Sequence, residues 1–317
     1  MRKIPAALAV LTLAVVGLTG CSMPGASACT RPAVPDQDVM DQISVTGDVG
    51  SAPTLDAATP FHTEHVSFED AVVGDGTPIT SENQVVVVDV TLYSGQTGEN
   101  LAATQYSGDL TDVRQVSTLT QLFPGMGDSL HCATEGSRVV VALPPGGVEQ
   151  QTASSLGMND DDSAIAVIDI EKVYLPAADG SNVYNSGTGL PTVVRAPDGR
   201  PGIIVPDGAP PTDLVVQTIK KGDGEVVTGD VPVRVHYTGV KWDDKTVFDT
   251  TWDAEPKSIT LDSVAPGFAT AIKGATVGSQ IMVVVPPKEQ GDKAAGTGST
   301  LVYVIDILGL DAAPAPQ

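Results

Sequence analysis

The chain contains an internal duplication, and this feature limits its possible folds more than any other. Two long segments of the first half recur in the second half in the same order: LFPGMGDSLHCATEGSRVVVALPP (Leu122–Pro145) as Val264–Pro287, and SAIAVIDI (Ser163–Ile170) as Thr300–Ile307. The copies lie 142 and 137 positions apart. Because this period is much longer than that of a solenoid repeat, we expect two related domains in tandem.

A third pair of segments extends the duplication toward the start of each copy. VVVVDVTLYSG (Val85–Gly95) matches VPVRVHYTG (Val231–Gly239), which aligns Tyr93 with Tyr237. Alternating β-branched residues in these segments are typical of strands. One short helix is predicted within Pro266–Gly274, because proline favours the first helical position and glycine favours the end. The sequence therefore predicts an α+β fold with two domains, each a curled antiparallel β-sheet around one short α-helix.

The composition of the remaining segments suggests the domain boundaries. We expect a first domain at residues 61–175 and a second at residues 213–310. Residues 176–212 contain 13 prolines or glycines, which predicts a linker. Residues 21–60 are small and polar, which predicts a flexible stalk, and residues 311–317 are expected to form a tail.

The first 20 residues have the features of an export signal. Arg2 and Lys3 precede the apolar run Ile4–Gly17, which is too short to span a membrane comfortably. The LTGC ending resembles the lipobox of bacterial lipoproteins, which implies cleavage before Cys21 and a lipid on its sulfur, with palmitate among the acyl chains. Two acyl chains hold a protein stably on a bilayer. We therefore expect an extracytoplasmic protein, anchored to the cell membrane through Cys21. The alternative is an ordinary secretory signal followed by a chance cysteine.

Charge and cysteine content narrow the function further. With 39 acidic and 17 basic residues the net charge is −22, so the chain should repel nucleic acid. Outside the cytoplasm, the remaining pair Cys29 and Cys132 is expected to form a disulfide, although two free buried thiols are the alternative. No residue spacing completes a metal site or a cofactor loop, so we expect neither, and we expect a monomer.

One short stretch concentrates aromatic residues around a carboxylate. HYTGVKWDDKTVFDTTW (His236–Trp252) belongs to a chain that is only 4% aromatic. The order YTG…FD…T, followed by VAPGF…AIKG…VG and by a final LVYVIDIL, resembles the FKBP-type peptidyl-prolyl isomerases. The resemblance covers about Asp213–Leu310 well. The first copy, about His65–Leu175, resembles the family only through its framework.

The resemblance implies a shallow apolar pocket that holds a proline ring beside the preceding amide. Carried over position by position, the pocket takes catalytic residues from the first strands and substrate-binding residues from the helix and the last strand: Tyr237, Phe248 and Asp249, then Val264, Ala265, Phe268 and Tyr303. The backbone N–H of Ala265 is implied to bind a substrate carbonyl. On strands, aromatic residues such as these are otherwise more often simply core residues.

The implied chemistry explains why no nucleophile is needed. Amide resonance holds back rotation with a barrier of about 18–20 kcal/mol, and bonds before proline exchange isomers in tens to hundreds of seconds. The twisted transition state has less charge separation than the planar amide, so a dry apolar pocket favours it. Each 1.36 kcal/mol of this preference is worth about tenfold in rate.

The sequence also departs from the family pattern. Phe268 stands where the family usually has tryptophan, and the loop after Pro287 lacks the family's tyrosine. The first copy has no Phe-Asp pair, and Met126 stands at its floor position, so this copy is expected to bind weakly or act as a spacer. We expect the second copy to isomerise proline bonds in unfolded or proline-containing exported polypeptides. A non-catalytic binding module or chaperone for such polypeptides is the alternative.

Overall fold

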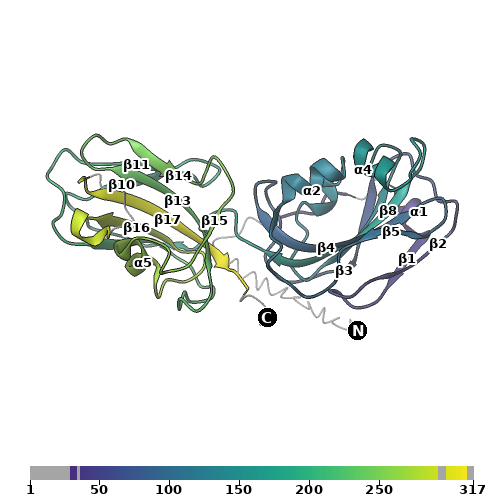
Figure 1. Ribbon diagram of the computed structural model, residues 1–317, viewed down its shortest axis with the longest axis horizontal. Helices are drawn as coiled ribbons and strands as arrows, with labels where there is room; N and C mark the ends of the chain where they lie inside the picture. Colours follow the sequence, from purple (N-terminus) through teal and green to yellow (C-terminus); the bar gives the residue numbers. More distant parts are fainter. Residues whose placement is uncertain (1–28, 34–35, 292–297, 313–317) are drawn as a thin grey trace, which may run out of the picture.

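The computed structural model describes residues 29–33, 36–291 and 298–312, and it contains two lobes that lie side by side (Figure 1). Each lobe is built on one antiparallel sheet with few helices, which agrees with the predicted α+β class. The chain passes from the first lobe to the second between Val173 and Ala178, where the backbone N–H of Leu175 donates to the carbonyl of Leu308.

Several predictions concern residues outside the described part of the chain. These are the signal peptide at residues 1–20, the lipid site at Cys21 and most of the tail, residues 313–317. Among the described residues, no helix has the length and apolar character that crossing a membrane requires.

The sheet of the first lobe has six strands. Their spatial order is β3 (Ser67–Val72), β7 (Arg138–Leu143), β8 (Ala164–Val173), β4 (Val85–Ser94) and β5 (Asn100–Ala103), with β6 (Arg114–Gln115) also beside β4. The central strands β7 and β8 are almost fully buried, as their unbroken apolar sequences require.

The sheet of the second lobe repeats this arrangement. Its order is β9 (Ser181–Asn182), β12 (Val215–Lys221), β16 (Gln280–Val285), β17 (Leu301–Leu310), β13 (Val233–Lys241) and β14 (Val247–Thr250), with β15 (Lys257–Ile259) also beside β13. Apart from β9, the strands follow one another in the same spatial order as in the first lobe. The duplication seen in the sequence is therefore also a duplication of the sheet.

Helices cover the inner face of each sheet. In the second lobe this is α5 (Pro266–Ile272), and η1 (Pro287–Glu289) is a short 3-10 turn. The first lobe instead has three helices after β6: α2 (Val116–Leu122), α3 (Gly127–Leu130) and α4 (Gln150–Ser155). The prediction of one short helix in each copy is thus wrong for the first lobe, because Ala153, Leu156 and Met158 give the segment after β7 an apolar face that packs on the core.

The strand register corrects the predicted alignment of the two copies. In the first lobe Asp89 lies opposite Asp169, and in the second lobe His236 lies opposite Asp306. Asp169 and Asp306 are equivalent residues of the repeated VIDI segment. Asp89 is therefore equivalent to His236, and the next residues along the two strands, Val90 and Tyr237, are equivalent to each other.

Tyr93 consequently does not occupy the position of Tyr237. It lies three residues after Val90, on the opposite face of the sheet, because side chains of a strand alternate between faces. There it is buried, and its hydroxyl donates to the carbonyl of Pro53 at 2.7 Å. The sequence alignment was misled by two tyrosines followed by a small residue and glycine.

The predicted flexible stalk is wrong for residues 36–60. This segment forms α1 (Gln37–Met40) and the hairpin of β1 (Ile43–Thr46) and β2 (Thr54–Ala57). Met40 and Ile43 are buried against the outer face of the first sheet together with Phe61. The segment is polar on average, but Val39, Val45 and Leu55 also pack on the side that meets the sheet.

The predicted linker at residues 176–212 is wrong for the same reason. Its proline- and glycine-rich sequence contains a second hairpin, β10 (Thr192–Arg195) with β11 (Pro201–Ile204). Val193, Ile203 and Val205 of this segment pack on the outer face of the second sheet. Both copies therefore begin with a hairpin that covers the outer face of the sheet that follows.

A buried ion pair fastens the hairpin of the first lobe. Arg138 donates to both carboxylate oxygens of Asp169 at 2.6 Å, and the two side chains are 1% and 0% exposed. The same guanidinium donates to the carbonyls of Gly47, Asp48 and Ser51, which belong to the turn between β1 and β2. One buried cation thus joins the sheet to its cover.

In the second lobe a different residue donates a hydrogen bond to the equivalent buried carboxylate, Asp306. Gln280 replaces Arg138 and donates to Asp306 at 2.6 Å, while Arg195 of strand β10 donates to the side-chain oxygen of Gln280 at 2.6 Å. The arginine is therefore on the sheet in the first lobe, as Arg138, and on the hairpin in the second lobe, as Arg195. Because it no longer contacts the carboxylate directly, burial raises the pKa of Asp306 to about 6.

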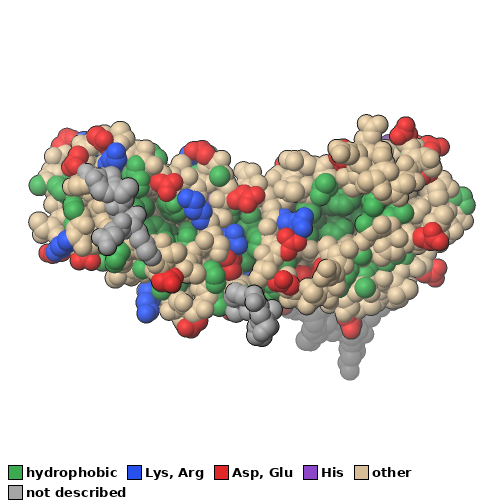
Figure 2. Space-filling view, viewed as in Figure 1, with side chains coloured by type: hydrophobic (Ala, Val, Ile, Leu, Met, Phe, Trp, Pro, Cys, Tyr) green, Lys and Arg blue, Asp and Glu red, His purple; other side chains and the backbone are tan. Residues whose placement is uncertain are grey.

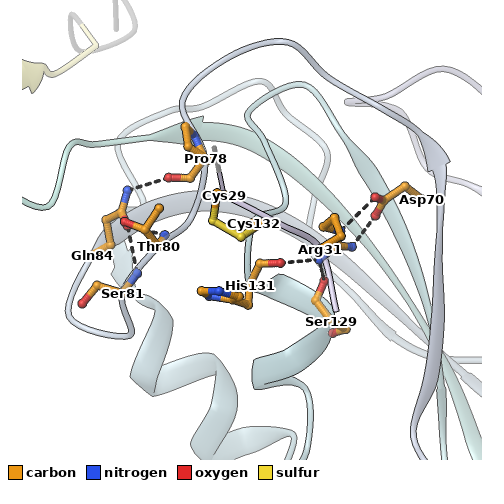
Figure 3. Close-up of a disulfide and its surroundings, with 10 residues drawn as sticks. All are labelled: Cys29, Arg31, Asp70, Pro78, Thr80, Ser81, Gln84, Ser129, His131 and Cys132. Carbon is orange, nitrogen blue, oxygen red and sulfur yellow. Dashed lines mark hydrogen bonds and ion pairs between the residues drawn. A yellow bond between two sulfur atoms is a disulfide. The ribbon is translucent and has the colours of Figure 1, made fainter. Parts of the chain in front are cut away.

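The expected disulfide is present, and it ties the first described residues to the first lobe (Figure 3). Cys29 and Cys132 are bonded across 103 positions of sequence. Beside the bond, Arg31 forms an ion pair with Asp70 and donates to the carbonyls of Ser129 and His131 at 2.6 and 2.8 Å. In the chain-entropy model a closed loop of this length stabilises a fold by at most about 4–5 kcal/mol.

We expect Arg138→Leu to lower the free energy of unfolding of the first lobe by about 3–5 kcal/mol, since Asp169 would be left buried without a partner. The matched control is Arg114→Leu, which removes an exposed pair with Asp112 and should cost less than about 1 kcal/mol. Urea unfolding followed by far-UV circular dichroism measures both. Equal losses in the two variants would contradict the assigned role of Arg138.

Candidate functional site

Four aromatic rings meet on the inner face of the second sheet. Tyr237 is on β13, Phe248 on β14, Phe268 on α5 and Tyr303 on β17. Tyr303 is central: its ring centroid lies 5.2 Å from that of Phe268, 5.5 Å from that of Phe248 and 6.2 Å from that of Tyr237. All these contacts are edge-to-face, the arrangement that aromatic quadrupoles favour.

The ring cluster extends from the core to the surface. Phe268 and Tyr237 are 4% and 8% exposed, Tyr303 is partly buried, and Phe248 is 37% exposed. The cluster is therefore a surface feature whose floor is buried and whose outer wall faces water.

Gly239 makes this arrangement of rings possible. A Cβ atom at this position would lie 2.7 Å from the ring of Phe248 and 3.1 Å from the ring of Tyr303. Gly239 is two residues beyond Tyr237 on β13 and thus on the same face. Any side chain here would push the rings apart.

The carboxylate of Asp249 is held by its neighbours. The hydroxyl of Tyr237 donates to Asp249 Oδ2 at 2.6 Å, and Lys257 Nζ lies 2.9 Å from that hydroxyl and 3.7 Å from the same carboxylate oxygen. Burial, and then the hydrogen bond to Asp249, raise the pKa of Tyr237, so the phenol stays neutral and remains a donor. The side chains of Asp249 and Lys257 are 43% and 52% exposed, so the ion pair is screened by solvent.

The start of α5 completes the group of residues that the sequence pointed to. Ala265 has an extended conformation, and Pro266 begins the helix in the first-turn position that the sequence predicted. Val264 and Ala265 are partly buried and pack against the same core as the rings. All seven predicted site residues thus belong to one core cluster or contact it directly.

Sequence reasoning missed Lys257. It lies on β15, eight residues after Asp249, and no pattern in the sequence connects it with the aromatic residues. Only the pairing of β15 with β13, in which Lys257 lies opposite Val235, brings it to Tyr237. Gly291 lies beside Pro266, and residues 292–297, which follow it, lie outside the described part of the chain.

The equivalent surface of the first lobe has no aromatic cluster. The register places Val90 at the position of Tyr237, Leu92 at that of Gly239 and Ala102 at that of Asp249. Met126, which corresponds to Phe268, is fully buried. The first lobe therefore lacks both the carboxylate and the aromatic rings at these positions.

Sequence comparison assigns the part of the chain that carries the ring cluster to a known class of proteins. A family model described as FKBP-type peptidyl-prolyl cis-trans isomerase matches residues 222–308, within the second lobe. The chain is 32% identical over 114 residues to a probable FK506-binding protein of Corynebacterium glutamicum, covering 34% of this chain and 97% of that relative. It is also 32% identical over 120 residues to an FK506-binding protein of Streptomyces anulatus, covering 35% and 97%.

A third relative is longer than the part it shares with this chain. It is the FKBP-type peptidyl-prolyl cis-trans isomerase FkpA of Escherichia coli, 36% identical over 110 residues, which are 33% of this chain and 40% of that protein. The chain belongs to the FKBP-type peptidyl-prolyl cis-trans isomerase family. Its matched part is the second copy of the duplication.

His236 lies on the opposite face of β13 from its neighbour Tyr237. Its ring faces the other side of β13, where it stacks on Trp252 with centroids 4.4 Å apart and lies 2.8 Å from the hydroxyl of Thr251. The side chain is 7% exposed, and burial lowers its pKa to about 4.

We expect this histidine to make the second lobe sensitive to acid. The folded pKa lies below the unfolded value of about 6.5, so the unfolded chain binds more protons between about pH 6.5 and 4. The contribution of neutral His236 to the free energy of unfolding is complete above pH 6.5, and about 3 kcal/mol of it is lost as the pH falls to 4. Urea unfolding followed by tryptophan fluorescence should show this loss in the wild type relative to His236→Gln. Parallel pH profiles for the two proteins would contradict it.

Proposed function

We propose that the second lobe catalyses cis/trans isomerisation of peptide bonds before proline. The observation that carries the proposal is the edge-to-face ring cluster that surrounds the hydrogen-bonded pair of Tyr237 and Asp249. A proline ring would pack on Phe268, between the edges of the neighbouring aromatic rings. The geometry supplies apolar contact and a fixed polar group, which are what rotation about an amide needs.

In the proposed mechanism no covalent bond is broken. The buried rings exclude water from the amide, which lowers the energy of the twisted state relative to the planar, more dipolar ground state. The backbone N–H of Ala265 donates to a substrate carbonyl and fixes the segment. Asp249 holds the phenol of Tyr237 in place and provides negative charge near the rotating carbonyl carbon.

The domain organisation belongs to the same proposal. We assign one FKBP-like domain to each lobe, with a degenerate copy at residues 61–175 and the isomerase copy at residues 213–310. Each is preceded by the hairpin that covers its sheet. Activity is assigned to the second copy because Val90 and Ala102 replace Tyr237 and Asp249 in the first.

The clients in this proposal are unfolded or proline-containing exported polypeptides, met at the outer face of the membrane. The support comes from the signal-like residues 1–20 with Cys21, and from the disulfide between Cys29 and Cys132, which suits an oxidising compartment. A lipid on Cys21 would keep the protein at the membrane, while its net charge of −22 would hold the lobes away from anionic lipid.

A second candidate function is binding without catalysis. It is favoured by Lys257, whose ammonium group lies close to both Tyr237 and Asp249 and offsets the negative charge there. Phe268 also offers a smaller floor than the tryptophan usual in the family. The second lobe would then hold proline-containing segments without accelerating their isomerisation.

We expect Phe248→Ala and Asp249→Val each to lower kcat/KM on a short proline peptide at least about tenfold, which corresponds to about 1.4 kcal/mol of lost transition-state stabilisation. Phe268→Trp should raise it, because a larger floor buries more of the proline. Val247→Ala is the matched control, an exposed neighbour on β14 that should leave the rate unchanged. A protease-coupled isomerisation assay measures all four variants.

The outcomes of this assay separate the two candidate functions. Equal rates for Phe248→Ala, Asp249→Val and the wild type would reject catalysis at this site. Saturable binding of the peptide, lost in Phe248→Ala and without acceleration in the wild type, would favour the binding module.

A further inference from the structure

Three side chains that can ligate a metal ion meet at the disulfide of the first lobe (Figure 3). The sulfurs of Cys29 and Cys132 and a ring nitrogen of His131 all lie within 4.8 Å of one another. No spacing in the sequence indicates this cluster, because 103 positions separate the two cysteines. The cluster has no part in the proposed isomerisation, which is assigned to the second lobe.

The disulfide accounts for the two cysteines but not for the histidine beside them. The side chain of His131 is exposed, and within the described part of the chain its ring has no hydrogen-bond partner. In the second copy of the duplication the residues equivalent to His131 and Cys132 are Lys273 and Gly274. The group of ligands is therefore specific to the first lobe.

Backbone hydrogen bonds fix the turn that carries two of the three ligands. The N–H of His131 donates to the carbonyl of Gly127 at 2.9 Å, and the N–H of Cys132 donates to the carbonyl of Ile79 at 2.7 Å. These bonds do not involve the disulfide. We therefore expect His131 and Cys132 to keep their positions when the disulfide is opened.

The third ligand, Cys29, is held through Arg31. The guanidinium of Arg31 pairs with Asp70 and donates to the carbonyls of Ser129 and His131 at 2.6 and 2.8 Å. Two residues of chain span at most about 7 Å, so Cys29 stays near the other two ligands without the disulfide. The carboxylate of Asp70 balances the charge of Arg31, which therefore does not repel a cation bound nearby.

Two thiolates and one imidazole are a ligand set typical of zinc. Thiolates favour Zn²⁺ over Mg²⁺ and Ca²⁺, which prefer oxygen ligands. Tetrahedral bonds of about 2.3 Å to sulfur and about 2.0–2.1 Å to nitrogen place the ligand atoms about 3.5–3.8 Å apart. The sulfurs must therefore separate by about 2 Å after the disulfide opens, a movement that side-chain rotation allows.

The charge of the protein also favours a cation. The net charge is −22, and Figure 2 shows Asp and Glu side chains spread over both lobes. A negative potential raises the local concentration of cations near a protein surface. This effect does not distinguish one cation from another, so selectivity must come from the two sulfurs and the ring nitrogen.

We propose that opening the disulfide converts Cys29, Cys132 and His131 into a binding site for Zn²⁺, with water in the fourth position. The disulfide and the metal ion use the same two sulfurs, so the oxidised protein does not bind the ion and the reduced protein does. The site thus responds to the redox state of the surroundings. It goes beyond the isomerase function proposed for the second lobe.

The reductant in this proposal is a protein dithiol. One of its thiolates attacks the sulfur of Cys29, which is partly exposed, and Cys132 leaves as a thiolate that takes up a proton. The second thiol of the reductant then displaces Cys29 from the mixed disulfide. Two electrons have passed to the cysteines, and the reductant has become a disulfide. On binding, Zn²⁺ displaces the two thiol protons.

The test uses the full, untagged chain carrying Cys21→Ser, so that Cys29 and Cys132 are its only cysteines. The protein is reduced with a phosphine in the absence of oxygen and titrated with Co²⁺, a spectroscopic probe of zinc sites, and then with Zn²⁺. His131→Ala removes one ligand. His65→Ala is the matched control, because His65 is an exposed histidine of the same lobe outside the cluster.

We expect the reduced protein to bind about one Co²⁺ per chain with a thiolate-to-cobalt charge-transfer band, and Zn²⁺ to abolish this band. His131→Ala should weaken binding at least about tenfold, and His65→Ala should leave it unchanged. Zn²⁺ should raise the thermal midpoint of the reduced chain and should not change that of the oxidised chain.

Far-UV circular dichroism tests the first step, because the first lobe should keep its native spectrum without the disulfide. Loss of that spectrum on reduction, absence of the charge-transfer band in the reduced chain, or equal affinities in His131→Ala and His65→Ala would each overturn the site. The isomerase rate on a short proline peptide should be equal in all these proteins. Failure of this proposal is therefore distinguishable from failure of the proposed isomerase.

Discussion

A carboxylate buried at the centre of each sheet organises both lobes. Asp169 and Asp306 are fully desolvated, and a charge in such a place is costly unless donors surround it. The donors come partly from the hairpin that precedes each sheet: the backbone N–H of Gly50 contacts Asp169, and Arg195 reaches Asp306 through Gln280. The need to satisfy one acid thus explains why segments that look like a stalk and a linker fold onto the outer faces.

The hairpin covers the outer face. The ring cluster of the second lobe and the apolar groove of the first lobe, which Val90, Leu92 and Leu119 line, both lie on the inner face. Here the two copies have diverged in a coordinated way. In the second lobe Gly239 leaves room for the rings, and Asp249 is held by Tyr237 and Lys257. In the first lobe Leu92 fills the place of Gly239 and the rings are absent, while α2 and α4 add aliphatic walls. One framework therefore carries two inner-face surfaces with different chemistry, one aromatic and one mainly aliphatic.

A short segment between Val173 and Ala178 connects the lobes. A backbone hydrogen bond from the N–H of Leu175 to the carbonyl of Leu308 also joins them.

Sequence reasoning reached the site of the second lobe through its resemblance to the FKBP family, whose motifs the chain keeps in the same order. Tyr237, Phe248, Asp249 and Phe268 follow one another along strands and one helix whose order is fixed, so a linear pattern was enough to select residues that the structure brings together. Lys257 was missed because its contact depends on strand pairing. Tyr93 was misplaced because a shift of three residues along a strand reverses the face, and the sequence motif alone does not record the register.

By itself, the sequence determined the duplication and the antiparallel α+β class, since these depend on periodicity and on short-range order along the chain. The residues of the aromatic cluster followed from the resemblance to the FKBP family. The tertiary structure alone decided that residues 36–60 and 176–212 are integral parts of the lobes, and that the first copy carries a groove in place of the rings. The physical reason is the same in both cases. Burial of Asp169 and Asp306, and the space left by Val90 and Ala102, are properties of side chains that meet from distant positions, which no local pattern contains.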